Sequence, residues 1–163
     1  MAGRGRSRTT WGMSNASRWP TGRLGERIAA RVVCEQLLAR FHANVDAGRA
    51  TDGVELFAPG ALIDLPAGRA QGYEEIGRLL SARQAASGRI TLHAVGSFDF
   101  QMASGHEASA SGALVVYAGE LDNVGRVPEA VARYAAGFRR DDRGWSISGL
   151  EVELVGGGVA TRR

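Results

Sequence analysis

The sequence predicts an α+β fold in which one curved antiparallel sheet wraps around three N-terminal helices. Apolar residues recur at helical spacing in the first half of the chain, whereas long extended segments separated by turn sequences fill the second half. Helices that precede a meander of strands, with no internal repeats, favour an antiparallel sheet over a doubly wound parallel one. At 163 residues, 44% of them hydrophobic, the chain is long enough to bury the core of one domain.

A long first helix is predicted from residue 24 to residue 45. Its apolar positions are Leu24, Ile28, Val33, Leu37, Leu38, Phe41 and Val45. Gly48 is expected to end this helix, because glycine readily adopts the left-handed conformation that follows a helix. A short second helix is expected to begin after Thr51 or Asp52 as its cap and to stop at Pro59 and Gly60.

The remaining elements are a hairpin, a third helix and a run of strands. The segment ALIDLPAGRAQGY indicates a short hairpin, and a helix is predicted from about Tyr73 to Ala86, with Glu74 and Glu75 in its first turn, where the helix dipole favours acids. The sequences ASGHE and DDRG are tight turns between consecutive strands, which is typical of an antiparallel sheet. Three or four extended segments are expected, at residues 89–101, 106–119, 129–141 and 144–154.

Positive charge is concentrated at the two ends of the chain. The formal net charge is +3, and all 20 basic residues are arginines. Seven of them lie near the ends, which leaves 13 arginines against 17 acids in residues 26–161, a formal charge of about −4. We therefore expect a disordered basic tail over residues 1–23, a domain over residues 24–155, a flexible C-terminal tail over residues 156–163, and no nucleic-acid partner.

Several classes of protein are disfavoured by what the sequence lacks. No apolar run approaches the roughly 18 residues of a membrane span. No apolar segment follows the Arg-rich start as it would in a secretory signal, so we expect a cytoplasmic protein without a membrane partner. Cys34 is the only cysteine, which excludes an internal disulfide. Three widely separated histidines give no metal-binding pattern and the scattered glycines give no phosphate loop, so no metal or other cofactor is expected.

Four segments carry a resemblance to a known family: FHANVDAG, VELFAPGALIDLPAGRAQGYEEI, TLHAVG and YAAGFRRDDRGWSISGL. Together they resemble the SnoaL-like branch of the nuclear transport factor 2-like superfamily, over about residues 26–155. The resemblance implies a cone, in which a bent sheet closes around helices and leaves a deep, mostly apolar pocket at its open end. It implies no single activity, because that superfamily includes dehydratases, isomerases, cyclases and proteins without catalysis.

Departures from the subfamilies narrow the choice of chemistry. The chain has Leu65 and Ala136 where ketosteroid isomerases carry acidic groups, so that activity is disfavoured. Asp46 and His93 match an Asp and a His of scytalone-dehydratase-like enzymes. Val45 stands where those enzymes have a tyrosine, and their second histidine has no counterpart on the next strand. Half of that site is therefore retained.

His93 is the strongest candidate for proton transfer. Alternation along its strand places it on one face with Thr91 and Val95, and a polar residue that points into a cone needs a reason to be there. Its alternative role is that of a core histidine with a satisfied hydrogen bond. The resemblance implies that Asp46 orients His93 and raises its pKa. Asp46 could instead serve only the helix end and its turn, and we favour that simpler role for it.

Eight residues are expected to wall the pocket and bind substrate. They are Phe41, Phe57, Val95, Val115, Tyr117, Tyr134, Phe138 and Trp145. Most such residues are ordinary core, but the two tyrosines have hydroxyls that must be satisfied if buried, and either could replace the missing acid. His42 and His106 are expected to be structural or exposed, and Asp64 to point outward.

Two classes of function remain open. The first is a cofactor-independent lyase or isomerase, dehydratase-like, with His93 as acid or base on a small apolar hydroxy- or oxo-compound. The second is a non-catalytic small-molecule-binding or accessory protein of the same fold. A homodimer through the outer face of the sheet is also expected, because the strands after residue 105 carry apolar residues on both faces.

Overall fold

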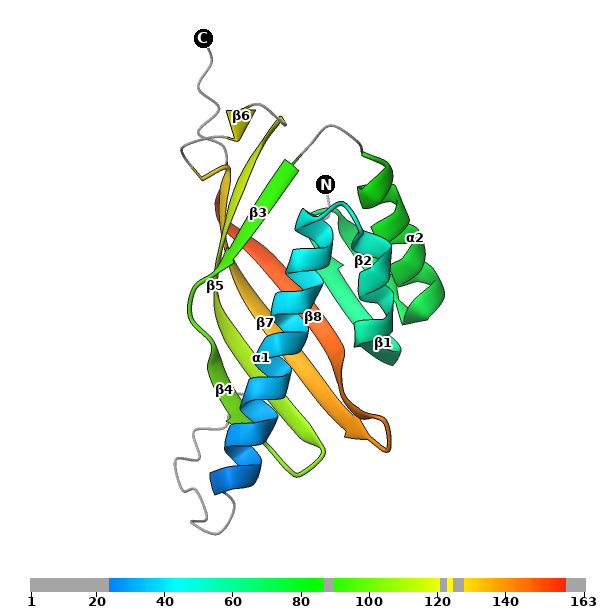
Figure 1. The fold of residues 1–163 in the computed structure, drawn as a ribbon, viewed down its shortest axis with the longest axis vertical. Helices are drawn as coiled ribbons and strands as arrows, with labels where there is room; N and C mark the ends of the chain where they lie inside the picture. The colour runs from blue at the N-terminus through cyan, green and yellow to red at the C-terminus, as the bar shows by residue number, and fades with distance from the viewer. Residues whose placement is uncertain (1–23, 87–89, 121–122, 125–127, 158–163) are drawn as a thin grey trace, which may run out of the picture.

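The computed structural model describes residues 24–86, 90–120, 123–124 and 128–157 (Figure 1). The predicted basic tail over residues 1–23 lies outside the described residues, as do residues 158–163. In chain order the elements are α1 (Leu24–Asp46), the 3₁₀ helix η2 (Ala50–Leu56), β1 (Phe57–Leu65), β2 (Gly68–Gln71), α2 (Gly72–Ala85), β3 (Ile90–Val95), β4 (Asp99–Met102), β5 (Glu107–Glu120), β6 (Asn123–Val124), β7 (Ala130–Asp141) and β8 (Gly144–Gly157).

The strands form one curved sheet in the order β2-β1-β8-β7-β5-β3, with β4 and β6 also paired to β5. The order of helices before strands and the α+β class are as predicted. The sheet is mixed, however, because β1 pairs with β8 in parallel while the other described pairs are antiparallel. The prediction of a purely antiparallel sheet is therefore wrong at this one pair. The pairs among strands β3 to β8 are all antiparallel, whereas β8 runs in the same direction as its other neighbour, β1.

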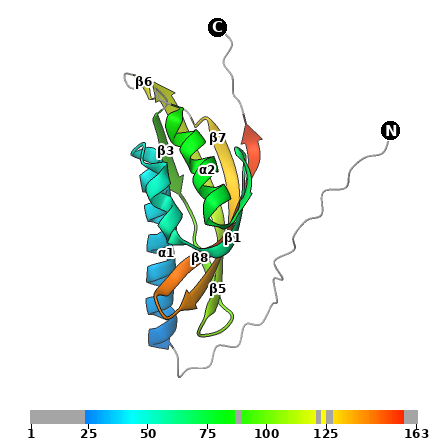
Figure 2. The same cartoon turned by 90° about the vertical axis from the view of Figure 1, so that its right-hand side faces the viewer.

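Helix α1 lies along the concave face of the sheet, and α2 lies on the same side next to β1 and β2 (Figures 1 and 2). The buried face of α1 repeats at intervals of three and four residues, so one stripe of the helix packs on the sheet. This stripe consists of Ala30, Cys34, Leu37, Leu38, Phe41 and His42. Each large apolar side chain buried here contributes about 1.5–3 kcal/mol relative to exposure, which fixes the helix on the sheet.

The second helix differs from its prediction. It is a 3₁₀ helix that follows Arg49 without a side-chain cap, so neither Thr51 nor Asp52 caps it. It also ends earlier, because Phe57 already begins β1 and both Pro59 and Gly60 lie within that strand. The register of β1 against β8 shifts between Phe57 and Leu62, and Gly60 has φ +76° inside this irregularity. Proline and glycine thus mark a bulge here, where the sequence indicated the end of a helix.

Two strand boundaries also differ. The predicted strand over residues 89–101 is divided into β3 and β4, both of which pair with β5. Strand β8 continues to Gly157, two residues beyond the predicted end of the domain at residue 155. Among the described residues, no helix is both long and apolar enough to cross a membrane.

Alternation along the strands decides which side chains face the helices. On β5 and β7 the even-numbered positions are the buried ones, among them Leu114 and Ala132, and on β8 they include Leu150. On β3 the odd-numbered positions face inward, so Thr91 and His93 point to the same side of the sheet as α1. The strands therefore supply an apolar wall, into which β3 introduces two polar residues.

Candidate active site

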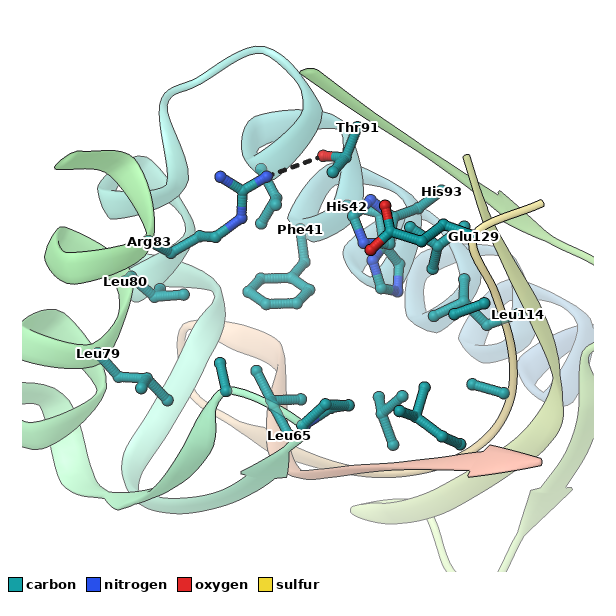
Figure 3. Close-up of a pocket in the computed structure, with 18 residues that line it drawn as sticks. Phe41, His42, Leu65, Leu79, Leu80, Arg83, Thr91, His93, Leu114 and Glu129 are labelled. Atoms are coloured by element: carbon teal, nitrogen blue, oxygen red, sulfur yellow. Dashed lines mark hydrogen bonds between the residues drawn. The ribbon is translucent and has the colours of Figure 1, made fainter. Parts of the chain in front are cut away.

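A cavity of about 270 Å³ lies between the C-terminal end of α1, helix α2 and the concave face of the sheet (Figure 3). Most of its wall is apolar. Its polar members are His42, Arg83, Thr91, His93 and Glu129. The apolar members are Phe41, Val45, Leu65, Pro66, Ala67, Leu79, Leu80, Leu114, Val116, Ala130, Ala132, Val152 and Leu154. A concave apolar site with a few convergent polar groups is the usual form of a small-molecule pocket.

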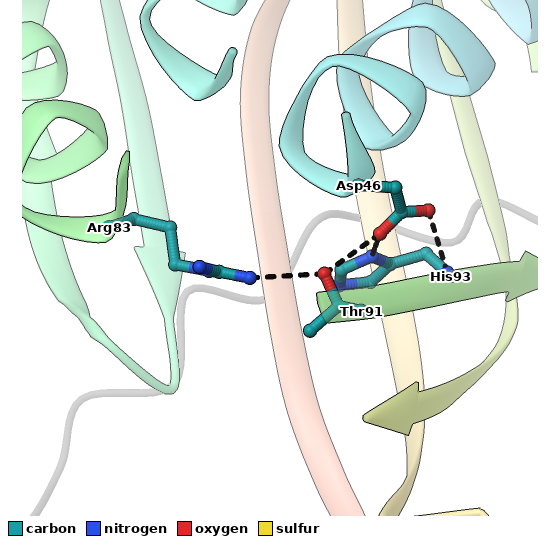
Figure 4. Close-up of polar contacts among 4 residues, drawn as sticks. All are labelled: Asp46, Arg83, Thr91 and His93. Carbon is teal, nitrogen blue, oxygen red and sulfur yellow. Dashed lines mark hydrogen bonds and ion pairs between the residues drawn. The ribbon is translucent and has the colours of Figure 1, made fainter. Parts of the chain in front are cut away.

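Asp46 and His93 meet at the wall of this cavity (Figure 4). Oδ1 of Asp46 lies 2.5 Å from Nδ1 of His93, and Oδ2 accepts a hydrogen bond of 2.8 Å from the His93 backbone N–H. The hydroxyl of Thr91 donates to Oδ1 at 2.9 Å. Burial alone would raise the pKa of Asp46, but the hydrogen bonds from His93 and Thr91 outweigh it and hold that pKa below its ordinary value.

The Asp46 contact determines how His93 can act. A carboxylate at Nδ1 holds a proton on that nitrogen, so Nε2 of the neutral ring carries the free lone pair. The side chain is 15% exposed and lines the cavity, which leaves Nε2 as its remaining polar atom. His93 can therefore accept a proton at Nε2 while Asp46 stabilises the resulting cation.

The carboxylate of Asp46 bonds to β3, not to the turn that follows α1. The sequence favoured a role for Asp46 in that turn, whereas its side-chain hydrogen bonds in the structure join it to Thr91 and His93. The turn itself is closed by backbone bonds, including one of 2.8 Å from the Arg49 N–H to the carbonyl of Asn44. Asp46 thus fastens the end of α1 to β3 and orients the imidazole of His93.

Arg83 extends this polar chain from helix α2. Its Nη2 donates a hydrogen bond of 3.0 Å to the Thr91 hydroxyl, which in turn donates to Asp46 (Figure 4). Residues from α1, α2 and β3 are joined in this way at one side of the cavity. Arg83 was not predicted from the sequence, because its helix shows no motif and only the packing of α2 brings it to the pocket.

His42 was expected to be structural or exposed; it is not exposed, and it lies next to His93. It is 5% exposed, and its ring stacks on His93 with the centroids 4.9 Å apart and the planes 24° from parallel. The ring of Phe41 contacts the His42 ring in an edge-to-face arrangement, with the ring centroids 5.3 Å apart. Burial and the neighbouring His93 lower the pKa of His42 to about 4, with Asp46 opposing in part. Its position four residues before Asp46, on the same helix face, was the signal that could have found it.

Most of the eight predicted pocket residues lie elsewhere. Phe41 lines the cavity. Phe57, Tyr134 and Phe138 are buried in the core, and the partly buried Val95 and Trp145 pack against that core. Val115 and Tyr117 occupy odd-numbered positions of β5, which face away from the helices. The neighbouring even positions, Leu114 and Val116, line the cavity instead. A one-residue error of parity moves a side chain to the opposite face of a sheet, and that error explains the placement of Val115 and Tyr117. The other five residues belong to the core or pack against it without lining the cavity.

The buried tyrosine satisfies its hydroxyl away from the cavity. Tyr134 donates a hydrogen bond of 2.6 Å to the backbone carbonyl of Ser97. Burial, with a smaller contribution from Glu35, raises its pKa to about 12. It is therefore a structural residue and not the replacement acid. Asp64 and His106 are exposed, as expected. The described residues contain no cluster of three or more His, Cys, Asp or Glu side chains that could hold a metal ion.

Comparison with known proteins agrees with this architecture. A model of the SnoaL-like domain family matches residues 26–151. No curated protein sequence matches the chain significantly. Among solved structures, an NTF2-like protein with a cystatin-like fold from Novosphingobium aromaticivorans is 25% identical, with a TM-score of 0.67 over 82% of this chain and 86% of that one.

Two further structures share the fold at lower identity. A candidate scytalone dehydratase from Novosphingobium aromaticivorans DSM 12444 is 13% identical, with a TM-score of 0.70 over 85% of this chain and 99% of that one. The hexachlorocyclohexane dehydrochlorinase LinA-type3 from Novosphingobium barchaimii LL02 is 16% identical, with a TM-score of 0.71 over 85% of this chain and 95% of that one.

Proposed function

Because the chain belongs to the SnoaL-like domain family, we propose that it is a cofactor-independent lyase or isomerase, dehydratase-like, that acts on a small, largely apolar hydroxy- or oxo-compound. The observation that carries this proposal is the pairing of Asp46 with His93 at the wall of an apolar cavity. His93 is the acid and base of the reaction, and Asp46 is its orienting partner.

The geometry supports the following chemistry. Nε2 of His93 takes a proton from a carbon next to a carbonyl, and the electrons of that C–H bond move toward the carbonyl oxygen. Asp46 stabilises the cationic imidazole without taking the proton itself. The imidazolium then returns the proton to a departing hydroxyl, which leaves as water, or to another carbon, which gives an isomer. Apolar residues around the site exclude water and so favour these transfers over exchange with solvent.

The names of the similar structures agree with this class of reaction. A dehydratase removes water and a dehydrochlorinase removes hydrogen chloride, and both are eliminations in which a proton leaves carbon. A base near neutral pH and no cofactor suffice for such steps. At these sequence identities the similarity shows only a shared fold. The proposal for this chain therefore depends on its own His93 and Asp46.

A non-catalytic binding or accessory protein is the second candidate. The bond from the His93 backbone N–H to Asp46 is the observation that favours it, because that bond would fasten α1 to β3 without any chemistry. The two candidates differ in whether the imidazole of His93 is needed after a ligand has bound.

The deciding experiment begins with a screen for co-purified ligands and for small ketones and alcohols that bind. With a ligand identified, His93→Ala should abolish turnover while binding weakens little, since loss of a general acid or base typically lowers the rate about 100-fold or more. His106→Ala is the matched control, because that histidine is exposed in the turn before β5. Turnover by His93→Ala equal to that of the parent would overturn the acid–base role of His93, whereas a parent that binds a ligand without converting it would favour the binding protein.

We also propose that the protein is a homodimer through the outer face of the sheet. An outer apolar patch is formed by five side chains on β3, β5 and β7: Leu92, Ala94, Val115, Tyr117 and Val131. In the strand register Leu92 pairs with Tyr117, and Val115 pairs with both Ala94 and Val131. Within this patch Leu92 is 55% exposed and Val131 is 42% exposed. Contiguous apolar side chains across three strands are the usual mark of a covered surface.

A further inference from the structure

His42 carries a buried polar atom that the fold does not satisfy. Its Nε2 is the one buried side-chain nitrogen or oxygen in the described part of the chain that has no hydrogen-bond partner. Such atoms are rare in folded proteins, because burying a polar group without a partner destabilises the fold. His42 also lines the cavity, beside His93 (Figure 3).

Packing alone does not explain a histidine at this position. The side chain is among the buried stripe of α1 and touches the edge of Phe41, where Leu or Phe would fill the same space without an unpaired nitrogen. His93 does not satisfy it either. The two rings are stacked face to face, whereas the N–H and the lone pair of an imidazole lie in the plane of the ring. No group of the described residues therefore satisfies this nitrogen, and the cavity that His42 lines is the place where a ligand would supply its partner.

We propose that His42 is the second catalytic contact of the pocket, whose Nε2–H donates a hydrogen bond to the carbonyl oxygen of the substrate. This inference rests on the proposed function, because it places the oxygen at His42 and the acidic carbon at His93. With ring centroids 4.9 Å apart, the two imidazoles reach only atoms that are close together in one ligand. A carbonyl oxygen and the hydrogen-bearing carbon next to it meet that condition, so the substrate class is an enolisable ketone or aldehyde.

The two histidines then have different tasks. His93 takes the proton from carbon, the electrons of the C–H bond form the carbon–carbon double bond of the enolate, and the carbonyl π electrons move to oxygen. His42 keeps its proton and stabilises the charge that develops on that oxygen. Its burial and the adjacent His93 lower its pKa to about 4, so it remains a neutral donor while His93 cycles through its cationic form. His42 thus supplies a second polar group in a chain that lacks the tyrosine and the second histidine of scytalone-dehydratase-like enzymes.

The proposal can be tested with 2-tetralone, a bicyclic ketone with an acidic C–H next to its carbonyl, and with tetralin, the same ring system without the oxygen. The parent should bind 2-tetralone more tightly than tetralin and should speed its hydrogen–deuterium exchange in D₂O. His42→Phe keeps an aromatic ring against His93 and Phe41 but removes the donor. It should weaken 2-tetralone binding by about three- to tenfold, leave tetralin binding unchanged, and slow the exchange by about 100-fold.

His42→Gln is the matched variant, because its amide can still donate a hydrogen bond. It should recover part of the preference for the ketone. If His42→Phe does not fold, His42→Gln is compared with His42→Leu instead, by the same binding and exchange measurements. In the parent, the ¹⁵N resonance of His42 Nε2 should shift when 2-tetralone binds but not when tetralin binds. A purely structural histidine would give no such difference.

Failure of this inference can be told apart from failure of the proposed function. If His93→Ala stops exchange while His42→Phe binds and exchanges 2-tetralone like the parent, the role of His42 is overturned and that of His93 stands. If His42→Phe loses the ketone preference while His93→Ala exchanges normally, the contact at His42 stands and the acid–base role of His93 fails. A parent that binds the two probes equally would overturn the carbonyl substrate class.

Discussion

The carboxylate of Asp46 is held by hydrogen bonds with Thr91 and with the ring and backbone of His93, and these bonds predict a pH dependence. Because the folded protein holds its pKa below the ordinary value of 3.8, the ionised carboxylate stabilises the fold above that pH. This stabilisation is lost as the pH falls through the lower folded value. Asp46→Asn should therefore be less stable than the parent at neutral pH, and the difference should shrink in acid.

Urea unfolding from pH 7 to pH 3 measures this effect. Asp64→Asn, at an exposed position of β1, is the control and should follow the parent throughout. A constant difference between Asp46→Asn and the parent across this range would contradict the prediction, because it would mean that the charge of Asp46 does not contribute.

His42 predicts a second and larger pH window. Its pKa is ordinarily 6.5 and is lowered to about 4 by burial and by His93, so the unfolded chain binds a proton here that the folded protein excludes. The parent should lose stability as the pH falls from 6.5 toward 4. His42→Phe has no such group, so it should be more stable by about 1 kcal/mol or more and should decline less over that range. Thermal melts of both proteins at several pH values would reveal parallel curves if the prediction is wrong.

The two histidines also show what sequence can establish about single residues. Strand parity grouped His93 with Thr91 and Val95 on one face, and the structure, in which these residues alternate with exposed Leu92 and Ala94, shows that this is the inner face. His42 could not be assigned with the same ease, since both sides of a helix are possible until its packing partner is known. The stacking of His42 on His93 depends on where α1 crosses β3, and that crossing is set by tertiary contacts far apart in the chain.

At the scale of elements, Gly112 in β5 lies directly against the backbone of Ser97. A Cβ there would overlap the backbone carbonyl of Ser97 and would also meet Cε1 of Tyr134. Gly112→Ala should therefore destabilise the fold strongly, by about 2–4 kcal/mol, because the Ser97 carbonyl also accepts the hydrogen bond of Tyr134.

Gly77→Ala provides the contrast in a helix. A Cβ at Gly77 in α2 would lie 3.9 Å from Cγ2 of Val54, which is an ordinary contact. Alanine favours the helix, so this variant should gain about 0.5–1 kcal/mol. Calorimetry of the two variants tests the pair, and equal effects of the two substitutions would show that close approach at Gly112 is unimportant.

Elements with local signals were the predictable ones. The turn of the β1–β2 hairpin and the boundaries of α2 follow from turn residues and periodicity, and α2 agrees within one residue at each end. Strand β1 begins at Phe57, earlier than the predicted hairpin segment. The parallel pairing of β1 with β8 could not be predicted in this way, because its partners, such as Ile63 and Leu150, are distant in sequence. The inner parity of β5 was equally ambiguous, since Val115 and Val116 are both apolar and only the packing against α1 and α2 distinguishes them.

At the scale of the whole molecule, the outer apolar patch predicts the oligomeric state. Light scattering at micromolar concentration should give twice the chain mass of 17.2 kDa. Leu92→Arg combined with Val131→Arg should give a monomer, because two charges would have to be buried at the interface. Ile28→Arg is the control, since Ile28 is 54% exposed but lies on α1. A parent that scatters as a monomer would refute the homodimer.

The parallel pair of β1 and β8 also bears on how the protein is made. On a ribosome β1 emerges early, yet the residues that pair with it, from Ile147 to Glu151, emerge only after the rest of the sheet. The nascent chain must therefore hold one edge of β1 unpaired during most of synthesis, and contacts of such high sequence separation form slowly. Val152 and Leu154 of β8 also line the cavity, so the pocket can form only after nearly the whole domain has been synthesised.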